Sequence, residues 1–286
     1  MDRFKIKIIL VLLFILGSIA RFIPHMPFWL NYPGVLVMPV VIFLIVDGYY
    51  HTTSLEKYIK RLMIGGEILL IGNFIISLAL MKGPEGRLDY SNLSSKSYAY
   101  IIGLIIIALI FLILNFKDKC LNDGMVMIFI FVLSVGTNIV LREVNFQISI
   151  LGNNMFLVLA GILVLLKALD ESKNGTDKRS IIKVLIVFAI CIFTETSIIG
   201  PAFAFIIYEF RNNKRMIVTG LFVLSGLLVP GFTLKALLVA PQWMMFFGII
   251  FILLYNEKEG VKIKKPFYFI YPLCLWIPFI IGALIS

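Results

Sequence analysis

The sequence predicts an all-α polytopic membrane protein, and three observations lead to this fold class. The 286 residues are 60% hydrophobic and 15% charged, with a mean hydropathy of +1.01. Apolar runs near the length that spans a bilayer recur from end to end. Charged residues gather in short stretches between these runs. We therefore expect a multi-pass protein of the cytoplasmic membrane, solvated by the lipid bilayer.

The apolar runs predict eleven helical spans. The first run follows Arg3, Lys5 and Lys7 and precedes Ser18-Ile19-Ala20, as in a signal peptide; we expect an uncleaved span because so many spans follow. No fixed-period repeat is visible, so residues 1–286 are expected to form a single membrane domain. The predicted spans are 6–23, 34–50, 58–81, 98–116, 124–141, 148–169, 181–195, 197–210, 217–234, 237–255 and 267–285.

The segment 181–210 decides the number of crossings. As one helix it would be about 45 Å long, well beyond a hydrocarbon core of roughly 30 Å. Thr194-Glu195-Thr196-Ser197 and Gly200-Pro201 supply polar and helix-breaking residues for a turn. The segment is thus expected to form two short spans or a re-entrant pair, giving about eleven crossings (10–11).

The distribution of positive charge supports this split. With the N-terminus inside, 20 of the 26 Lys and Arg residues fall in predicted inside segments and 6 fall outside. If residues 181–210 formed a single span, the Lys and Arg residues would be divided almost evenly between the inside and outside segments. Because Lys and Arg favour cytoplasmic loops, the bias predicts the N-terminus inside and the C-terminus outside. Topology accounts for the net charge of +10, so no nucleic-acid partner is expected.

Several kinds of site are missing from the sequence. There is no P-loop, GxGxxG, HExxH, CxxC or GxSxG motif. Two histidines cannot build a His-rich metal site. Cys120, Cys191 and Cys274 are odd in number and far apart in sequence, so they form neither a disulfide framework nor a metal-binding pattern, and no metal is expected. No inverted repeat with matched broken helices indicates a transporter, although transport of a small solute stays an alternative.

The stretch VVIFLIVDGYYHTTSLEKYIKRL, residues 40–62, ends an apolar run in polar residues at the predicted cytoplasmic face. In a structural interpretation it is a helical hairpin, in which a residue among 52–54 caps the next helix and cations meet lipid phosphate. In a functional interpretation Asp47 or His51 transfers a proton in a polar pocket, and the cations bind a phosphate-bearing donor. These cations are Lys57, Lys60 and Arg61.

Other polar residues are expected at membrane depth: Glu67 in the third span, Glu195 between the seventh and eighth spans, and Asn153-Asn154 in the sixth span. A carboxylate at that depth is costly unless it is paired or faces water. Asn pairs and single Glu residues also join helices by hydrogen bonds. Each is therefore a candidate for a site or for a helix contact.

Five stretches, in order along the chain, resemble the motifs of one membrane-protein family. Residues 38–62, MPVVIFLIVDGYYHTTSLEKYIKRL, are similar to FPIFAFLLVEGYxHTxNxxKYLxRL. Glu67 in IGGEI and Asn154 in NNMFLVLAGIL follow at matching places. TETSIIGPAFAFIIYEFR is similar to TDYGxYGxxxxxxFYxFR, and LLYNEKEG followed by FYFIYPLCLW is similar to LYNGxRG followed by FYxFYPxHL. The chain thus resembles the TraX family, membrane acetylases named for acetylation of conjugative F-type pilin.

The resemblance implies acetyl transfer within the membrane. Acetyl-CoA would bind from the cytoplasm, near the phosphate-binding cations Lys57, Lys60 and Arg61, and the acceptor would be a pilin, a peptide or a glycan. A neutral histidine would take the proton of the acceptor as it attacks the thioester. The residues expected to line the pocket are Asp47, His51, Glu67 and Glu195.

The chain departs from the family where the catalytic histidines are expected. Gly17-Ser18 stand in place of Asp-His in the first span, and Cys274 stands in place of the His after Tyr-Pro. Either the alignment slips at both ends of the chain, or the chemistry of the family is changed or lost. Cys274 could carry an acyl group as a thioester, although a buried inert thiol is expected. A non-enzymatic assembly, immunity or binding protein on the same scaffold is the alternative.

Overall fold

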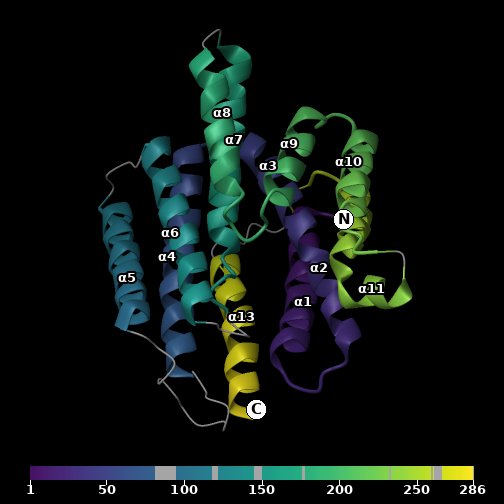
Figure 1. The fold of residues 1–286 in the computed structure, drawn as a ribbon. Helices are drawn as coiled ribbons and strands as arrows, with labels where there is room; N and C mark the ends of the chain where they lie inside the picture. The colour runs from purple at the N-terminus through teal and green to yellow at the C-terminus, as the bar shows by residue number, and fades with distance from the viewer. Residues whose placement is uncertain are drawn as a thin grey trace. The chain divides into compact units, whose positions relative to one another are not determined.

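The structure is a computed structural model, and all regular elements among its described residues are helices (Figure 1). It describes residues 1–80, 95–117, 122–144, 150–175, 178–231, 233–258, 260 and 266–285. Within these ranges five helical segments are long and apolar enough to cross a membrane. They are Phe28–His51, Leu55–Ala79, Ser95–Phe116, Asp123–Arg142 and Tyr268–Ile285. The prediction of an all-α protein with several candidate membrane spans is confirmed.

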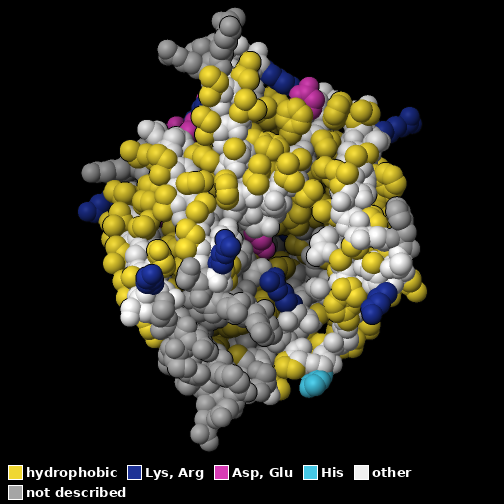
Figure 2. Space-filling view, viewed as in Figure 1, with side chains coloured by type: hydrophobic (Ala, Val, Ile, Leu, Met, Phe, Trp, Pro, Cys, Tyr) yellow, Lys and Arg dark blue, Asp and Glu magenta, His cyan; other side chains and the backbone are white. Residues whose placement is uncertain are grey.

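Exposed apolar side chains indicate contact with lipid. On α5 (Ser95–Phe116), Ile102, Ile106 and Ile113 are 55%, 50% and 52% exposed, and they follow the spacing of one helix face. The opposite face carries buried apolar residues, including Leu104. A helix that is apolar on both its packed and its open face is suited to a bilayer. Apolar side chains also cover much of the face seen in Figure 2.

The chain packs as two compact units, residues 1–50 with 202–286 (unit 1) and residues 51–201 (unit 2). The expected single membrane domain stays a prediction. Unit 1 contains α1 (Arg3–Phe22), the 3-10 helix η1 (Phe28–Asn31), α2 (Tyr32–Val35), α3 (Val37–His51), most of α9 (Ile199–Glu209), α10 (Lys214–Gly226), α11 (Leu234–Val239), the 3-10 helix η2 (Pro241–Gly248), α12 (Ile249–Leu254) and α13 (Pro266–Ile285). Unit 2 contains α4 (Leu55–Ala79), α5, α6 (Asp123–Val144), α7 (Met155–Asn174) and α8 (Lys178–Cys191).

Helices α1 and α13 of unit 1 pack side by side and run in the same direction (Figure 1). Phe14 stacks on Tyr271 with ring centroids 4.9 Å apart, and Phe22 meets Phe279 edge to face at 5.4 Å. Eight residues therefore separate the two contacts on each helix, which is the register of a parallel pair. This register puts buried Ser18, on α1, at the level of residues 274–275 on α13.

A close approach of two glycines fixes how α1 meets α2. A Cβ built on Gly17 would lie 2.8 Å from the Cα of Gly34, and a Cβ on Gly34 would lie 3.0 Å from the Cα of Gly17. Both neighbouring atoms belong to backbone, which cannot move aside as a side-chain tip can. Only glycine on each side permits this contact.

In unit 2, α7 is the central helix. All of residues 156–166 are buried, and α4, α6 and α8 pack around them. Asn154 caps this helix by accepting a hydrogen bond from the Leu157 amide, and its own amide donates to the carbonyl of Gly66 at 2.8 Å. Asn73 donates to the carbonyls of Ile150 and Asn153 at 2.8 and 3.1 Å. A side-chain amide thus forms hydrogen bonds with the backbone carbonyls of the segment that leads into α7.

The start of α7 corrects one prediction. The sixth span was expected from residue 148, with Asn153 and Asn154 inside it. The helix begins instead at Met155, and both asparagines precede it. An asparagine that bonds the amide three residues ahead ends the preceding irregular segment and begins the helix.

Two further spans differ from the prediction, and both contain proline. The span expected over 217–234 is α10, which ends at Gly226; Pro230 lies shortly beyond, where a helix cannot continue. The span expected over 237–255 comprises the end of α11, then η2 and α12. Ala240 leaves helical geometry, and Pro241 begins the 3-10 helix.

The predicted break within 181–210 is confirmed. Helix α8 ends at Cys191, α9 begins at Ile199, and turns occupy 192–198. The two helices have 14 and 11 residues, or about 21 and 17 Å. Two short crossings and a re-entrant pair both remain predictions for this segment.

Candidate functional site

Stretches far apart in the sequence meet at the C-terminal end of α3 in unit 1. Asp47 lies one turn before the end of α3, and Tyr255 directly follows α12. The Tyr255 hydroxyl donates to Asp47 Oδ2 at 2.7 Å, and the Arg3 guanidinium donates to the same oxygen as an ion pair. The side chains of Arg3 and Asp47 are 15% and 13% exposed. Asp47 therefore ties together α1, α3 and the segment after α12.

The donors of this cluster converge on one carboxylate oxygen of Asp47. The Tyr255 hydroxyl is the donor of its hydrogen bond, because a carboxylate oxygen only accepts. Since two donors occupy Asp47 Oδ2, the proton transfer predicted for this carboxylate would require loss of its ion pair. The geometry gives Asp47 a structural role.

The segment after α12 is also bound to the start of α10. Lys214 donates from Nζ to the Tyr255 carbonyl at 3.2 Å and lies 3.4 Å from a carboxylate oxygen of Glu257. Glu257 has a φ of 63°, in the left-handed region. The family pattern to which this segment is similar has glycine at that place, the residue that adopts this conformation most readily.

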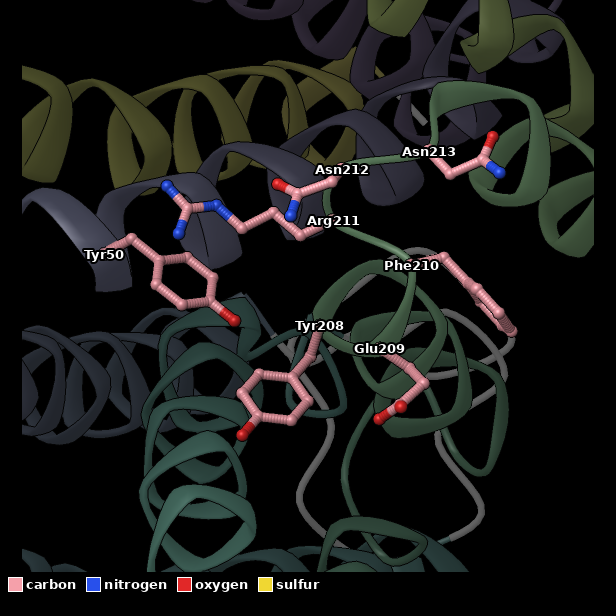
Figure 3. Close-up of a pocket in the computed structure, with 7 residues that line it drawn as sticks. All are labelled: Tyr50, Tyr208, Glu209, Phe210, Arg211, Asn212 and Asn213. Atoms are coloured by element: carbon pink, nitrogen blue, oxygen red, sulfur yellow. The ribbon is translucent and has the colours of Figure 1, made fainter. Parts of the chain in front are cut away.

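A pocket opens beside the last turn of α3, with a volume of about 340 Å³ (Figure 3). The Arg211 guanidinium lies 3.7 Å from the centroid of the Tyr50 ring. The rings of Tyr50 and Tyr208 are nearly parallel, with centroids 6.3 Å apart and an interplanar angle of 12°. In Figure 3 the side chain of Arg211 extends over Tyr50, whereas Phe210 points away from both tyrosines. The lining residues are Tyr50, Tyr208, Glu209, Phe210, Arg211, Asn212 and Asn213.

The turn between α9 and α10 positions these side chains. Helix α9 ends at Glu209, and the Asn213 side chain caps α10 by accepting from the Met216 amide at 3.3 Å. This cap fixes the short turn that carries Arg211. Aromatic faces beside a guanidinium suit a planar ligand with negative charge, because the rings can stack and the guanidinium can bind phosphate in a bidentate manner.

The other predicted residues of the 40–62 stretch lie at the end of α3 and the start of α4. His51 is exposed and ends α3. Ser54 caps α4 by accepting from the Lys57 amide at 3.4 Å, as the helical-hairpin interpretation expects. Arg61 donates to the Lys57 carbonyl at 3.1 Å, and its guanidinium lies 5.8 Å from the Tyr58 ring centroid. Lys57 and Arg61 are exposed, and Lys60 is partly exposed, so all three can meet phosphate.

Glu67 and Glu195 have separate surroundings in unit 2. Glu67 is fully buried on α4 and accepts a hydrogen bond from the Asn115 amide at 2.7 Å. Glu195 is exposed, in the turn between α8 and α9. Within that turn Ser197 has a φ of 50°, at the place where the family pattern has glycine. Asp47 belongs to unit 1, so the common pocket expected for these residues stays a prediction.

The two places where the resemblance expects histidines lie in one interface of unit 1. Ser18 on α1 and Cys274 on α13 are both buried, and the parallel register puts them at the same level. Cys274 is a free thiol. Neither side chain is a useful base, since a hydroxyl does not accept a proton readily and a buried thiol stays protonated.

Some residues of this site were not predicted as site residues. In the sequence, Arg3 and Arg211 have a topological explanation as inside charges, and Tyr208, Arg211 and Tyr255 stand out only as members of the motifs. Only the motif resemblance could have pointed to these residues, because YEFR and LLYNEKEG both contain residues that contact the C-terminal end of α3.

The chain matches no protein-family model, no curated protein and no solved structure. Its function is therefore inferred from its own residues, their geometry and the motif resemblance.

Proposed function

We propose that the protein is a TraX-like membrane protein that binds acetyl-CoA at its cytoplasmic face, and that it has lost the histidine base for efficient acetyl transfer. One observation carries the proposal. Three stretches of the resemblance meet at the end of α3, through the hydrogen bond from Tyr255 to Asp47 and through the contacts of Tyr50 with Tyr208 and Arg211. Motifs that share a site are expected to meet in space even when they are far apart in sequence.

The proposed topology has about eleven crossings, with the N-terminus inside and the C-terminus outside. An odd number of crossings makes the first and last spans parallel, and the register of Phe14 with Tyr271 and of Phe22 with Phe279 supports this. The end of α3 then faces the cytoplasm, which is where acetyl-CoA is available.

The pocket beside Tyr50 suits the nucleotide part of the donor. Tyr50 or Tyr208 can stack on adenine, and Arg211 can pair with phosphate. By the motif resemblance alone, Lys57, Lys60 and Arg61 at the start of α4 are also assigned to the donor phosphates.

Transfer requires the acceptor nucleophile to attack the thioester carbonyl, with loss of its proton and departure of the CoA thiol. A general base typically contributes about 10²–10⁴ to the rate of such a step. Neither Ser18 nor Cys274 replaces that base, so transfer to a pilin, peptide or glycan is expected to be slow or absent. Cys274 would take part only by forming a thioester itself, with release of CoA.

A second candidate is a non-enzymatic assembly, immunity or binding protein on the same scaffold. The contact between Gly17 and Gly34 favours it, because an aspartate side chain at position 17 would meet backbone. A third is a transporter of a small solute. Binding of labelled acetyl-CoA to the purified protein separates the first candidate from the other two, and solute flux in proteoliposomes would support the third.

A further inference from the structure

Glu67 is a buried carboxyl group whose two oxygens have different surroundings. It is 0% exposed and lies near the middle of the 25-residue helix α4. Oε1 accepts from the Asn115 amide at 2.7 Å. Oε2 is buried and has no hydrogen-bond partner in the part of the chain that the structure describes.

The neighbourhood of Glu67 is closed by tight packing. The adjacent Gly66 is so close to α7 that an added Cβ would lie 2.7 Å from a methyl carbon of Leu157, and its carbonyl accepts from Asn154. Helices α5 and α7 both pack against α4. Water therefore has little access to Oε2 in this packing.

Charged residues on these three helices lie at a distance from Glu67. On α4 the nearest is Arg61, six residues or about 9 Å along the axis. On α7, Lys167 lies ten residues, or about 15 Å, beyond Leu157 and pairs with Asp123 at 2.9 Å. The other charged residues of the three helices are Glu56, Lys57 and Lys60 on α4, Lys96 on α5, and Asp170, Glu171 and Lys173 on α7. No ion pair of Glu67 occurs among the described residues.

A carboxylate in these surroundings would be far costlier than a carboxylic acid. One amide donor does not compensate for removing a full charge from water, whereas burying a neutral acid with one unsatisfied polar atom costs far less free energy. A metal ion would need several oxygen ligands, and the described residues contain no cluster of three or more acidic, His or Cys side chains.

We propose that Glu67 is a neutral carboxylic acid that holds a proton within the apolar packing of α4, α5 and α7. The ligand of this site is a proton, and it can leave only when the packing around Oε2 opens to water or to a base. The inference is independent of acetyl-CoA binding, because it rests on unit 2 alone.

Infrared spectroscopy of the purified full-length protein at neutral pH tests this directly. A protonated carboxyl group gives a C=O stretching band separate from the bands of carboxylates and amides, and the band shifts on exchange of the acid proton for deuterium. We expect such a band in the wild type, its loss in Glu67→Gln, and its retention in the exposed control Glu171→Gln. Absence of the band, or its persistence in Glu67→Gln, would overturn the proposal.

The melting temperatures of Glu67 variants provide a second test, which applies even if the infrared band of Glu67 overlaps with other bands. Glutamine has the shape of the neutral acid, so Glu67→Gln should leave the melting temperature in detergent nearly unchanged, whereas Glu67→Lys should lower it strongly. If the native group were a carboxylate held by unseen donors, Glu67→Gln would leave those donors without their charge partner and lower the melting temperature as well. That result would count against a neutral Glu67.

Discussion

The hydroxyl of Tyr255 lies 2.7 Å from Asp47 Oδ2, and this hydrogen bond joins residues that are 208 positions apart. Arg3 pairs with the same oxygen. We predict that Asp47→Asn lowers the free energy of unfolding by about 3 kcal/mol, because it leaves Arg3 as a partly buried charge without its carboxylate. Tyr255→Phe should cost about 1 kcal/mol, the value of one hydrogen bond. Thermal unfolding in detergent measures both.

The matched control is the exposed pair of Lys214 and Glu257. Glu257→Gln should change the free energy of unfolding by less than about 1 kcal/mol, as expected for exposed ion pairs. If Asp47→Asn were as mild as this control, Asp47 would not be a structural tie, and a catalytic role for it would gain support.

The second prediction concerns the contact of Gly17 with Gly34. Gly17→Ala should destabilise the protein by about 1–3 kcal/mol, since its methyl group would press on backbone. Gly103→Ala in α5 is the control, because nothing lies within 4 Å of its added Cβ; it should be neutral or stabilising by up to about 1 kcal/mol. Equal effects in melting experiments would mean that α1 and α2 do not pack this closely.

The third prediction restores the missing imidazoles. The double change Ser18→His and Cys274→His should raise acetyl transfer above the wild-type level, which we expect to be slow or undetectable. Gly17→Asp, which would complete the family pattern, is left out because the glycine contact has no room for it. The assay is transfer of label from acetyl-CoA to membrane peptides or glycans.

Cys274→Ala is the control for that assay. Rapid acetyl transfer by the wild-type protein would contradict the proposal that it has lost efficient acetyltransferase activity. If that activity disappeared in Cys274→Ala, the thiol would be the nucleophile.

The fourth prediction concerns orientation. Cys120 is expected inside and position 94 outside, although both lie outside the described residues. A membrane-impermeant maleimide applied to intact cells should miss Cys120 and label Ser94→Cys. Labelling of Cys120 from outside would contradict the topology and the positive-inside bias from which it follows.

Hydrophobic runs predicted the long helices well because length and composition alone determine them. Helix α4, expected over 58–81, spans Leu55–Ala79, and α5, expected over 98–116, spans Ser95–Phe116. The breaks were harder to predict. In the sequence, Asn153-Asn154 is a polar pair within an apolar run, and only the hydrogen bonds of Asn154 to Leu157 and Gly66 show that it ends an irregular segment.

The candidate site was only partly predictable for a similar reason. Asp47 stands out in the sequence because it interrupts an apolar run. Its partners Arg3 and Tyr255 do not, because a positive charge near an N-terminus and a tyrosine at the end of an apolar run both have ordinary topological explanations. Pairing between distant residues follows from tertiary packing, which no local pattern contains.

The central claim is that the pocket beside Tyr50 binds the acetyl donor. Its most direct test is an equilibrium titration of labelled acetyl-CoA against the purified full-length protein, the Arg211→Gln variant and the Arg215→Gln variant. Arg211→Gln removes a charge that lines the pocket, whereas Arg215→Gln removes an exposed charge on α10 that does not. A charge-assisted hydrogen bond is worth about 1.5–3 kcal/mol, so Arg211→Gln should weaken binding by about 10–100-fold. Arg215→Gln should bind like the wild type. Absence of binding to the wild type, or equal affinity in all three proteins, would contradict the account.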